Sequence, residues 1–112
     1  GLADRADTRA GSLSHGEKRA LELAIALATR PRLLLLDEPL AGTSGAEAER
    51  LVQVMAGLKR QVTLVLIEHD MDAVFALADR VSVLVYGRII ATGTPDQVRA
   101  DPAVRAAYLG DA

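Results

Sequence analysis

The chain has 112 residues, of which 50% are hydrophobic and 25% are charged, and it contains no cysteine. That length allows one domain with a hydrophobic core, and the lack of cysteine excludes disulfides, zinc–thiolate sites and a thiol nucleophile. The 13 basic and 15 acidic residues leave a net charge of −2, which provides no broad basic field for binding nucleic acid.

A buried helix is predicted close to the N-terminus. Residues 1–12 are mostly small, polar or charged and are predicted to form a loop or a frayed helix. Over residues 18–29, strong helix formers occupy almost every position and apolar residues lie nearly all round the helix. Arg30 and Pro31 end this helix, because proline disfavours the helical conformation in the residue before it.

The segment before that helix, Leu13-Ser14-His15-Gly16-Glu17, has two interpretations. Ser14 and Glu17 match a capping box, which many ordinary helices carry. A helix N-terminus led by a hydroxyl and a glycine also presents backbone amides to an anion such as phosphate. Taken alone, the segment favours the plain cap and leaves the anion site open.

Two short apolar runs predict strands that are buried on both faces. Residues 33–36 are four leucines, and residues 62–67 are rich in β-branched side chains. Between them, Ser44 and Glu47 match a second capping box, and apolar residues at helical spacing predict an amphipathic helix over 46–59.

The rest of the chain predicts a further helix, a hairpin and C-terminal helices. In order, these are a helix over 71–78 capped by Asp70, strands over 81–86 and 89–91 joined by a turn at Gly87-Arg88, and a helix capped by Thr94 with Pro95 at its first position. Strands that alternate with helices predict an α/β fold, with a parallel sheet core flanked by helices and a C-terminal β-hairpin. In such sheets, ligands bind at the carboxyl ends of the strands.

Polar residues follow both predicted parallel strands. Asp37 and Glu38 come directly after the first strand, and Glu68, His69 and Asp70 come after the second. An acid at one strand end is often only a turn former, but the two groups together favour a site. The first carboxylate could place Mg²⁺, the next could activate water as a general base, and the histidine could hold a transferring phosphate.

The same side chains also fit a different kind of site. Asp37, Glu38, His69 and Asp70 could all ligate one metal ion, as in a metal-dependent hydrolase. The spacing of the residues excludes neither interpretation.

Three motifs, in this order and spacing, make the chain resemble the second half of an ATP-binding-cassette (ABC) ATPase. They are Leu13-Ser14-His15-Gly16-Glu17, Leu33-Leu34-Leu35-Leu36-Asp37-Glu38-Pro39 and Ile67-Glu68-His69-Asp70. The resemblance implies that residues 1–112 are the C-terminal half of a P-loop NTPase domain of the ABC type. It also implies ATP hydrolysis with Mg²⁺, in a head-to-tail dimer with a second ATPase subunit.

The first motif resembles the ABC signature. Ser14, His15, Gly16 and Glu17 fall on the segment that contacts the γ-phosphate of ATP held by the opposite subunit. The family usually has glycine at the position of His15 and often glutamine at that of Glu17. The resemblance therefore implies an altered backbone freedom and donor set at this position.

The other two motifs resemble the family's catalytic positions. Asp37 matches the Walker B aspartate that supports Mg²⁺, and Glu38 matches the catalytic carboxylate that polarises the attacking water. His69 matches the switch histidine that contacts the γ-phosphate.

A fourth segment falls on the D-loop, which couples the two sites across the dimer. It consists of Leu40, Ala41, Gly42, Thr43 and Ser44. The family usually has Asp or Asn where Ser44 stands, and a serine supplies neither the charge nor the reach of those side chains. We therefore expect weaker coupling between sites, with the capping role of Ser44 kept.

Parts of the D-loop and the tail are similar to the ATP-binding subunits of branched-chain amino acid importers, with urea and amide importers close by. These parts are Pro39-Leu40-Ala41-Gly42, residues 87–95 and residues 101–110. The similarity implies a peripheral protein at the cytoplasmic face of the plasma membrane that binds transmembrane permease subunits and works indirectly with a solute-binding protein. A plain structural explanation is that Val104, Tyr108 and Leu109 pack the last helical segment onto the domain.

The phosphate-binding loop of the form Gly-x-x-x-x-Gly-Lys-Ser/Thr is missing from the sequence. Its only lysines, Lys18 and Lys59, do not lie in that pattern, and no glutamine occupies a Q-loop position. We expect these parts upstream, in a longer chain, and we expect the 112 residues alone neither to bind nor to hydrolyse ATP.

The ends and apolar runs of the sequence predict neither a leader nor a membrane span. The chain starts without an initiator methionine or a basic-then-apolar leader, and its apolar runs are far shorter than the ~20 residues that cross a bilayer. Two other functional classes stay open: a non-transport ABC ATPase that acts on DNA or ribosomes, and an inactive interaction fragment.

Overall fold

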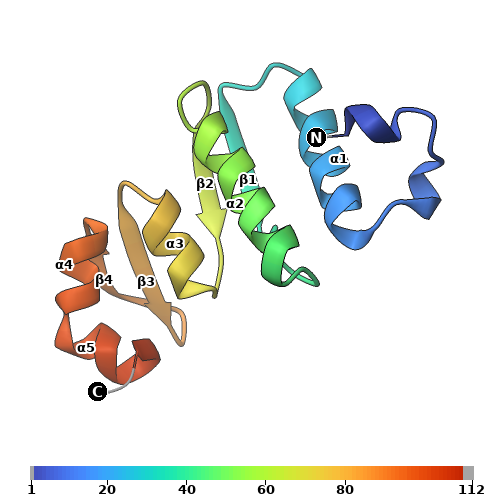
Figure 1. Cartoon of the computed structure of the whole chain (residues 1–112). Coiled ribbons are helices and arrows are strands. Elements are labelled where there is room, and N and C mark those ends of the chain that lie inside the picture. The colour runs from blue at the N-terminus through green and yellow to red at the C-terminus, as the bar shows by residue number, and fades with distance from the viewer. Residues whose placement is uncertain (1, 110–112) are drawn as a thin grey trace. The chain divides into compact units, whose positions relative to one another are not determined.

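The computed structural model describes residues 2–109 of the chain (Figure 1). Contacts divide it into two compact units, the first ending at His69 and the second beginning at Asp70. Gly110, which belongs to the tail similar to importer subunits, lies outside the described residues.

The first unit contains a parallel two-stranded sheet and two helices. After two short 3₁₀ turns at Ala3–Arg5 and Ala10–Ser12, its elements are α1 (His15–Ala28), β1 (Leu33–Asp37), α2 (Gly45–Leu58) and β2 (Thr63–Ile67). Strands β1 and β2 pair in parallel with Leu33 opposite Thr63 and Asp37 opposite Ile67, and α1 contacts α2. The buried apolar residues of the unit are Leu23, Leu34, Leu40, Leu51, Met55 and Val62.

The structure contradicts the predicted burial of these elements. Helix α1 buries only Gly16 and Leu23, and Leu35 of β1 is 70% exposed beside the buried Leu34. No residue of β2 is fully buried, and Ile67 is 59% exposed. Successive strand residues point to opposite faces, so the alternation shows that one face of this sheet is covered and the other is open.

The helix boundaries follow from how each helix is capped. Helix α1 starts at His15 rather than residue 18, because Ser14 is its N-cap: the Ser14 Oγ accepts from the Glu17 amide at 3.1 Å, and Glu17 Oε1 accepts from the Ser14 amide at 2.9 Å. This capping box is the one that the sequence predicts.

The second predicted capping box is wrong. Ser44 is the N-cap of α2 but makes no side-chain cap hydrogen bond. Its φ of −155° differs from the φ of −63°, −79° and −65° at Ser14, Asp70 and Thr94, whose side chains do accept from helix amides. The side chain of Glu47 lies against Gly16 of α1 instead.

The second unit is built on an antiparallel hairpin. Its elements are α3 (Met71–Leu77), β3 (Val81–Val85), β4 (Arg88–Gly93), α4 (Pro95–Ala100), α5 (Pro102–Val104) and a π-helical turn over Arg105–Leu109. A cluster of buried valines, Val81, Val83, Val98 and Val104, forms its core. None of the helices within residues 2–109 is both long enough and apolar enough to cross a membrane.

In the second unit, most of the helices, strands and caps predicted from the sequence are confirmed. Asp70 caps α3 through the Ala73 amide at 3.2 Å, and Thr94 forms a capping box with Gln97. The hairpin turn lies one residue earlier than predicted, at Tyr86-Gly87, with φ of 48° and 77°. Two successive positive φ values are those of a type I′ turn, whose twist matches that of the paired strands.

Candidate functional site

The carboxyl ends of β1 and β2 bring two polar segments together. The strand ladder ends where Asp37 lies opposite Ile67, and the Glu38 amide adds one further bond to the Ile67 carbonyl at 2.7 Å. Glu38 and His69 therefore leave the sheet at the same end, as the parallel arrangement predicts.

Glu38 and His69 contact each other through their side chains. The Glu38 Oε1 lies 3.0 Å from the His69 Nδ1, and the two side chains are 50% and 76% exposed. A carboxylate accepts only, so Nδ1 carries the proton of this hydrogen bond, and the tautomer of a neutral ring leaves Nε2 as an acceptor. A neutral ring can therefore accept a hydrogen bond from water through Nε2, whereas holding a phosphate oxygen requires the doubly protonated ring, whose Nε2–H donates.

Asp37 lies one residue before this pair, at the end of β1. It is exposed, and none of the hydrogen bonds or ion pairs within residues 2–109 involves its carboxylate. Carboxylate oxygens are the hard ligands that Mg²⁺ prefers, and one or two of them suffice when phosphate oxygens and water complete the octahedron. The donor chemistry of Asp37 therefore fits Mg²⁺.

The D-loop segment is folded against the start of α1. Leu40 is buried, and the Thr43 hydroxyl donates to the Leu40 carbonyl at 2.7 Å. The Arg19 guanidinium donates to the Ala41 carbonyl at 3.4 Å. Gly42 has a φ of 77°, and a Cβ added there would collide with the imidazole of His15.

Residues 14–17, the segment that resembles the ABC signature, are held by their own cap. Glu17, besides closing the capping box, pairs with Arg5 at 2.9 Å. The pKa of the Glu17 carboxyl is lowered from the ordinary 4.5, and the largest cause is the hydrogen bond that the Ser14 amide donates to it. Within residues 2–109, no hydrogen bond or ion pair joins residues 14–17 to Glu38 or His69, so the structure presents two separate groups of site residues.

Two family models match the chain. Residues 1–41 match the model described as ABC transporter, and residues 88–112 match the one described as branched-chain amino acid ATP-binding cassette transporter.

Individual relatives and a solved structure agree with these models. The chain is 44% identical to the high-affinity branched-chain amino acid transport ATP-binding protein BraF of Pseudomonas aeruginosa, over 99% of this chain and 44% of that protein. It is 42% identical to LivG of Escherichia coli, which has the same description, over 100% of this chain and 45% of LivG. The structure of a nucleotide-free ATP-binding cassette from an ABC transporter matches with a TM-score of 0.83 and 33% identity, over 98% of this chain and 46% of that one.

The chain belongs to the ABC transporter ATPase family. This confirms the family that the motifs resemble and the α/β fold class predicted from the alternation of strands and helices. The chain spans about half the length of the curated relatives it matches.

The alternative of a metal-hydrolase cluster gains no support in this ABC ATPase chain. Within residues 2–109, no group of three or more His, Asp or Glu side chains converges as metal ligands would. Asp70 instead uses its carboxylate to cap α3.

The sequence motifs assign no role to Glu68, which the structure places between the Leu40 and His69 amides. The Glu68 side chain is 1% exposed, and its Oε2 accepts from the Leu40 amide at 3.2 Å. Strand alternation indicates only that its side chain lies on the more buried face: Leu64 and Leu66 are the less exposed residues of β2, and Glu68 is next in that register.

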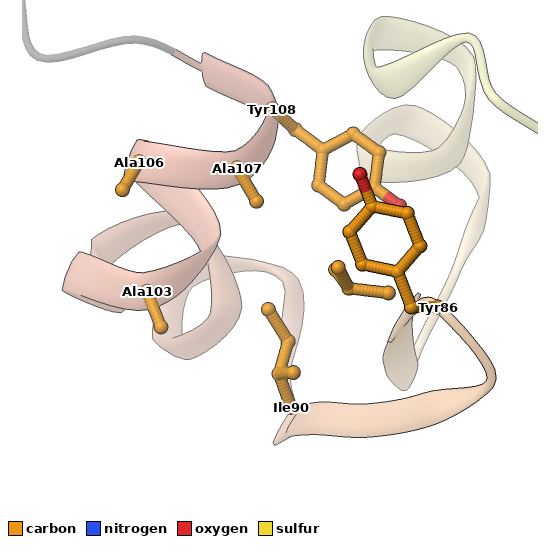
Figure 2. Close-up of a pocket in the computed structure, with 7 residues that line it drawn as sticks. Tyr86, Ile90, Ala103, Ala106, Ala107 and Tyr108 are labelled. Atoms are coloured by element: carbon orange, nitrogen blue, oxygen red, sulfur yellow. The ribbon is translucent and has the colours of Figure 1, made fainter.

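A separate pocket of about 700 Å³ lies in the second unit (Figure 2). Its lining is apolar apart from two tyrosines and comprises Val85, Tyr86, Ile90, Ala103, Ala106, Ala107 and Tyr108. The Tyr108 hydroxyl donates to the Leu84 carbonyl at 2.5 Å, and Val104 is fully buried. In this ABC ATPase chain the tail thus packs onto its unit, and the pocket includes none of the predicted site residues.

Proposed function

We propose that this chain is the C-terminal half of an ATP-hydrolysing subunit that powers an ABC importer of branched-chain amino acids or a related small polar solute. The contact between Glu38 and His69 at the ends of paired parallel strands carries the proposal. Family membership supports the reaction type. The match of residues 88–112 to the branched-chain amino acid model and the likeness to BraF and LivG support the solute class.

The proposed reaction is phosphoryl transfer from ATP to water. The water oxygen forms a bond to the γ-phosphorus while the bond from that phosphorus to the bridging oxygen breaks, and the leaving group is ADP. Glu38 orients the water and accepts a proton from it as the new bond forms, and His69, fixed through its Nδ1, faces the γ-phosphate. Asp37 would supply carboxylate oxygens to Mg²⁺, which when bound would offset the negative charge of the phosphates.

Ser14, His15, Gly16 and Glu17 are proposed to contact the γ-phosphate of ATP held by the opposite subunit. The D-loop, residues 40–44, is proposed to couple the two sites. The contacts of His15 with Gly42 and of Arg19 with Ala41 support this assignment, because they join the signature helix to the D-loop within one chain.

The proposed partners are a second ATPase subunit, transmembrane permease subunits and, indirectly, a solute-binding protein. The proposed location is the cytoplasmic face of the plasma membrane. The phosphate-binding loop belongs, in this proposal, to the half of the domain that the relatives carry beyond the matched region. Residues 1–112 are then a partial ABC ATPase domain.

The test is ATP hydrolysis by the complete subunit. We expect Glu38→Gln nearly to stop phosphate release while ATP still binds, because the amide no longer orients and polarises water as the carboxylate does; loss of such a group lowers turnover by about 10² or more. Glu49→Gln, at an exposed position of α2, is the matched control and should leave turnover unchanged.

Unchanged turnover of Glu38→Gln would contradict the assignment of Glu38. Uptake of labelled leucine by proteoliposomes that contain the complete transporter tests the solute class. ATP hydrolysis without leucine uptake would leave the ATPase assignment in place and reject branched-chain amino acids as the solute.

A further inference from the structure

Glu68 is a carboxylate that the fold removes from water at an otherwise exposed site. Its side chain is 1% exposed, whereas those of Glu38 and His69 are 50% and 76% exposed. Burying a carboxylate is unfavourable unless its oxygens are well bonded. Both oxygens of Glu68 accept a backbone amide, Oε2 from Leu40 at 3.2 Å and Oε1 from His69 at 3.1 Å.

These two bonds continue the link between the strands beyond the sheet. The last backbone bond between the strand ends runs from the Glu38 amide to the Ile67 carbonyl. Two residues after Glu38, the buried Leu40 has an amide that needs an acceptor. The Glu68 carboxylate supplies it, so the segment around Glu38 is tied to β2 on both sides.

That tie acts on a residue with an unfavourable backbone conformation. Glu38 has a φ of 48°, which L-residues avoid unless the surrounding structure holds them there. Its amide is held by Ile67, its carbonyl accepts from Ala41 at 3.1 Å, and the Glu68 carboxylate holds the amide of Leu40. The direction of the Glu38 side chain therefore depends on this set of bonds.

We propose that Glu68 is a positioning residue that sets the spacing between Glu38 and His69 and ties both to the first residue of the D-loop. The Glu68 Oε1 lies 3.6 Å from the His69 Nδ1, beyond hydrogen-bond distance, whereas Glu38 Oε1 lies at 3.0 Å. Glu68 thus acts through the backbone, and its burial keeps it from water and phosphate. The inference rests on the proposed function for its catalytic consequence only.

The experiment uses the complete subunit with Glu68→Gln and Glu68→Ala. Glutamine keeps the size of the side chain, but its NH₂ group faces a backbone N–H and loses one of the two bonds; alanine loses both. We expect hydrogen exchange of the Leu40 and His69 amides to become about tenfold faster or more. We expect kcat to fall about tenfold, with KM for ATP within about twofold. The reason is that ATP still binds, whereas Glu38 and His69 are displaced from the positions that hydrolysis requires.

Two controls separate positioning from general damage. Glu49→Gln should leave both exchange and turnover unchanged, and the amide of Leu51, in the buried part of α2, should exchange as in the unmodified subunit when the fold is intact. Unchanged exchange of Leu40 and His69 in both variants would overturn the inference. Faster exchange with unchanged kcat would also overturn it.

The two proposals fail in different ways. A subunit with the natural Glu68 that hydrolyses no ATP would contradict the proposed function, and the exchange of Leu40 and His69 would then decide by itself whether Glu68 makes the tie. Normal hydrolysis that is insensitive to Glu68→Gln would reject the positioning role of Glu68 and leave the proposed function in place.

Discussion

His69 is oriented by its neighbour Glu38 rather than by burial. The ring is 76% exposed, and the hydrogen bond of its Nδ1 with the Glu38 carboxylate at 3.0 Å is what restrains it. The imidazole and the carboxylate are therefore oriented as a pair, and loss of either side chain releases the other.

We expect His69→Ala in the complete subunit to lower ATP turnover by about tenfold or more, with only a modest loss of ATP affinity. The reason is that a contact to the γ-phosphate matters most while charge develops on it. Single-turnover hydrolysis and equilibrium nucleotide binding measure the two quantities. Loss of a bound metal ion in His69→Ala would instead support a hydrolase cluster.

Glu17 predicts a pH dependence of stability. Its pKa in the folded protein is lowered, chiefly by the hydrogen bond from the Ser14 amide. Its contribution is therefore complete above the ordinary pKa of 4.5 and is lost as the pH falls through the lower folded value. We expect Glu17→Gln to reduce the urea midpoint at pH 7, and the difference from the unmodified protein to shrink below pH 4.5. A constant difference over that range would contradict this.

Among the candidate site residues, the placement of those with exposed side chains, Glu38 and His69, was the easiest to predict from the sequence. Glu38 and His69 follow strands, and strand ends collect ligands in parallel sheets, so their meeting was foreseeable. Glu68 stands in the same motif, but its role depends on the turn that brings the Leu40 amide to its carboxylate. That turn is a property of the backbone after β1, which residue spacing does not specify.

At the scale of elements, helix α1 and the D-loop form one contact region. A Cβ at Gly42 would collide with the imidazole of His15, and the φ of 77° at Gly42 favours glycine in any case. His15, which stands where the resemblance to the ABC signature implies glycine, thus packs closely on Gly42.

We expect Gly42→Ala to destabilise the protein by about 1–2 kcal/mol from the backbone alone, and further through the collision with His15. Gly45→Ala isolates the backbone effect, since Gly45 has a φ of 55° but no neighbour near a Cβ. Adding His15→Ala to Gly42→Ala should recover the part due to the collision, as measured by urea denaturation in a double-mutant cycle. No coupling between the two changes would contradict the contact.

The caps show what an element's sequence can and cannot predict. Ser14, Asp70 and Thr94 cap their helices as predicted, because the local sequence supplies both partners. Ser44 fails although its pattern is equally good, because Glu47 lies against Gly16 and the backbone at Ser44 is extended. The failure comes from a contact between two helices, which a local pattern does not contain.

At the scale of the whole chain, the proposal that the phosphate-binding loop lies in the other half of the domain predicts that residues 1–112 alone bind no nucleotide. The sequence contains no phosphate-binding loop to hold the β- and γ-phosphates. Glu38 and His69 are proposed to contact only the attacking water and the γ-phosphate. Calorimetric titration with ATP and Mg²⁺ should show no saturable heat, whereas the complete subunit should bind. Saturable binding by this chain would contradict the prediction.

Burial of the two parallel strands on both faces is the sequence-based prediction from which the structure departs furthest. Runs such as 33–36 and 62–67 are typical of strands that are buried on both faces. In the structure, only one face of each strand is covered. Strand identity depends on the run itself and parallel pairing on the helix between the two runs, so both were predictable. Burial depends on what else packs there, and the chain is about half as long as its relatives.

The open face of the β1–β2 sheet has a practical consequence for work with the protein. Leu33, Leu35, Val65 and Ile67 are all about half exposed or more, and within the described chain each of the two strands pairs on one side only. Unpaired strand flanks with apolar side chains are templates for aggregation. Expressed by itself, the chain should therefore self-associate as its concentration rises, and dilute preparations or co-expression with the rest of the domain should keep it monodisperse.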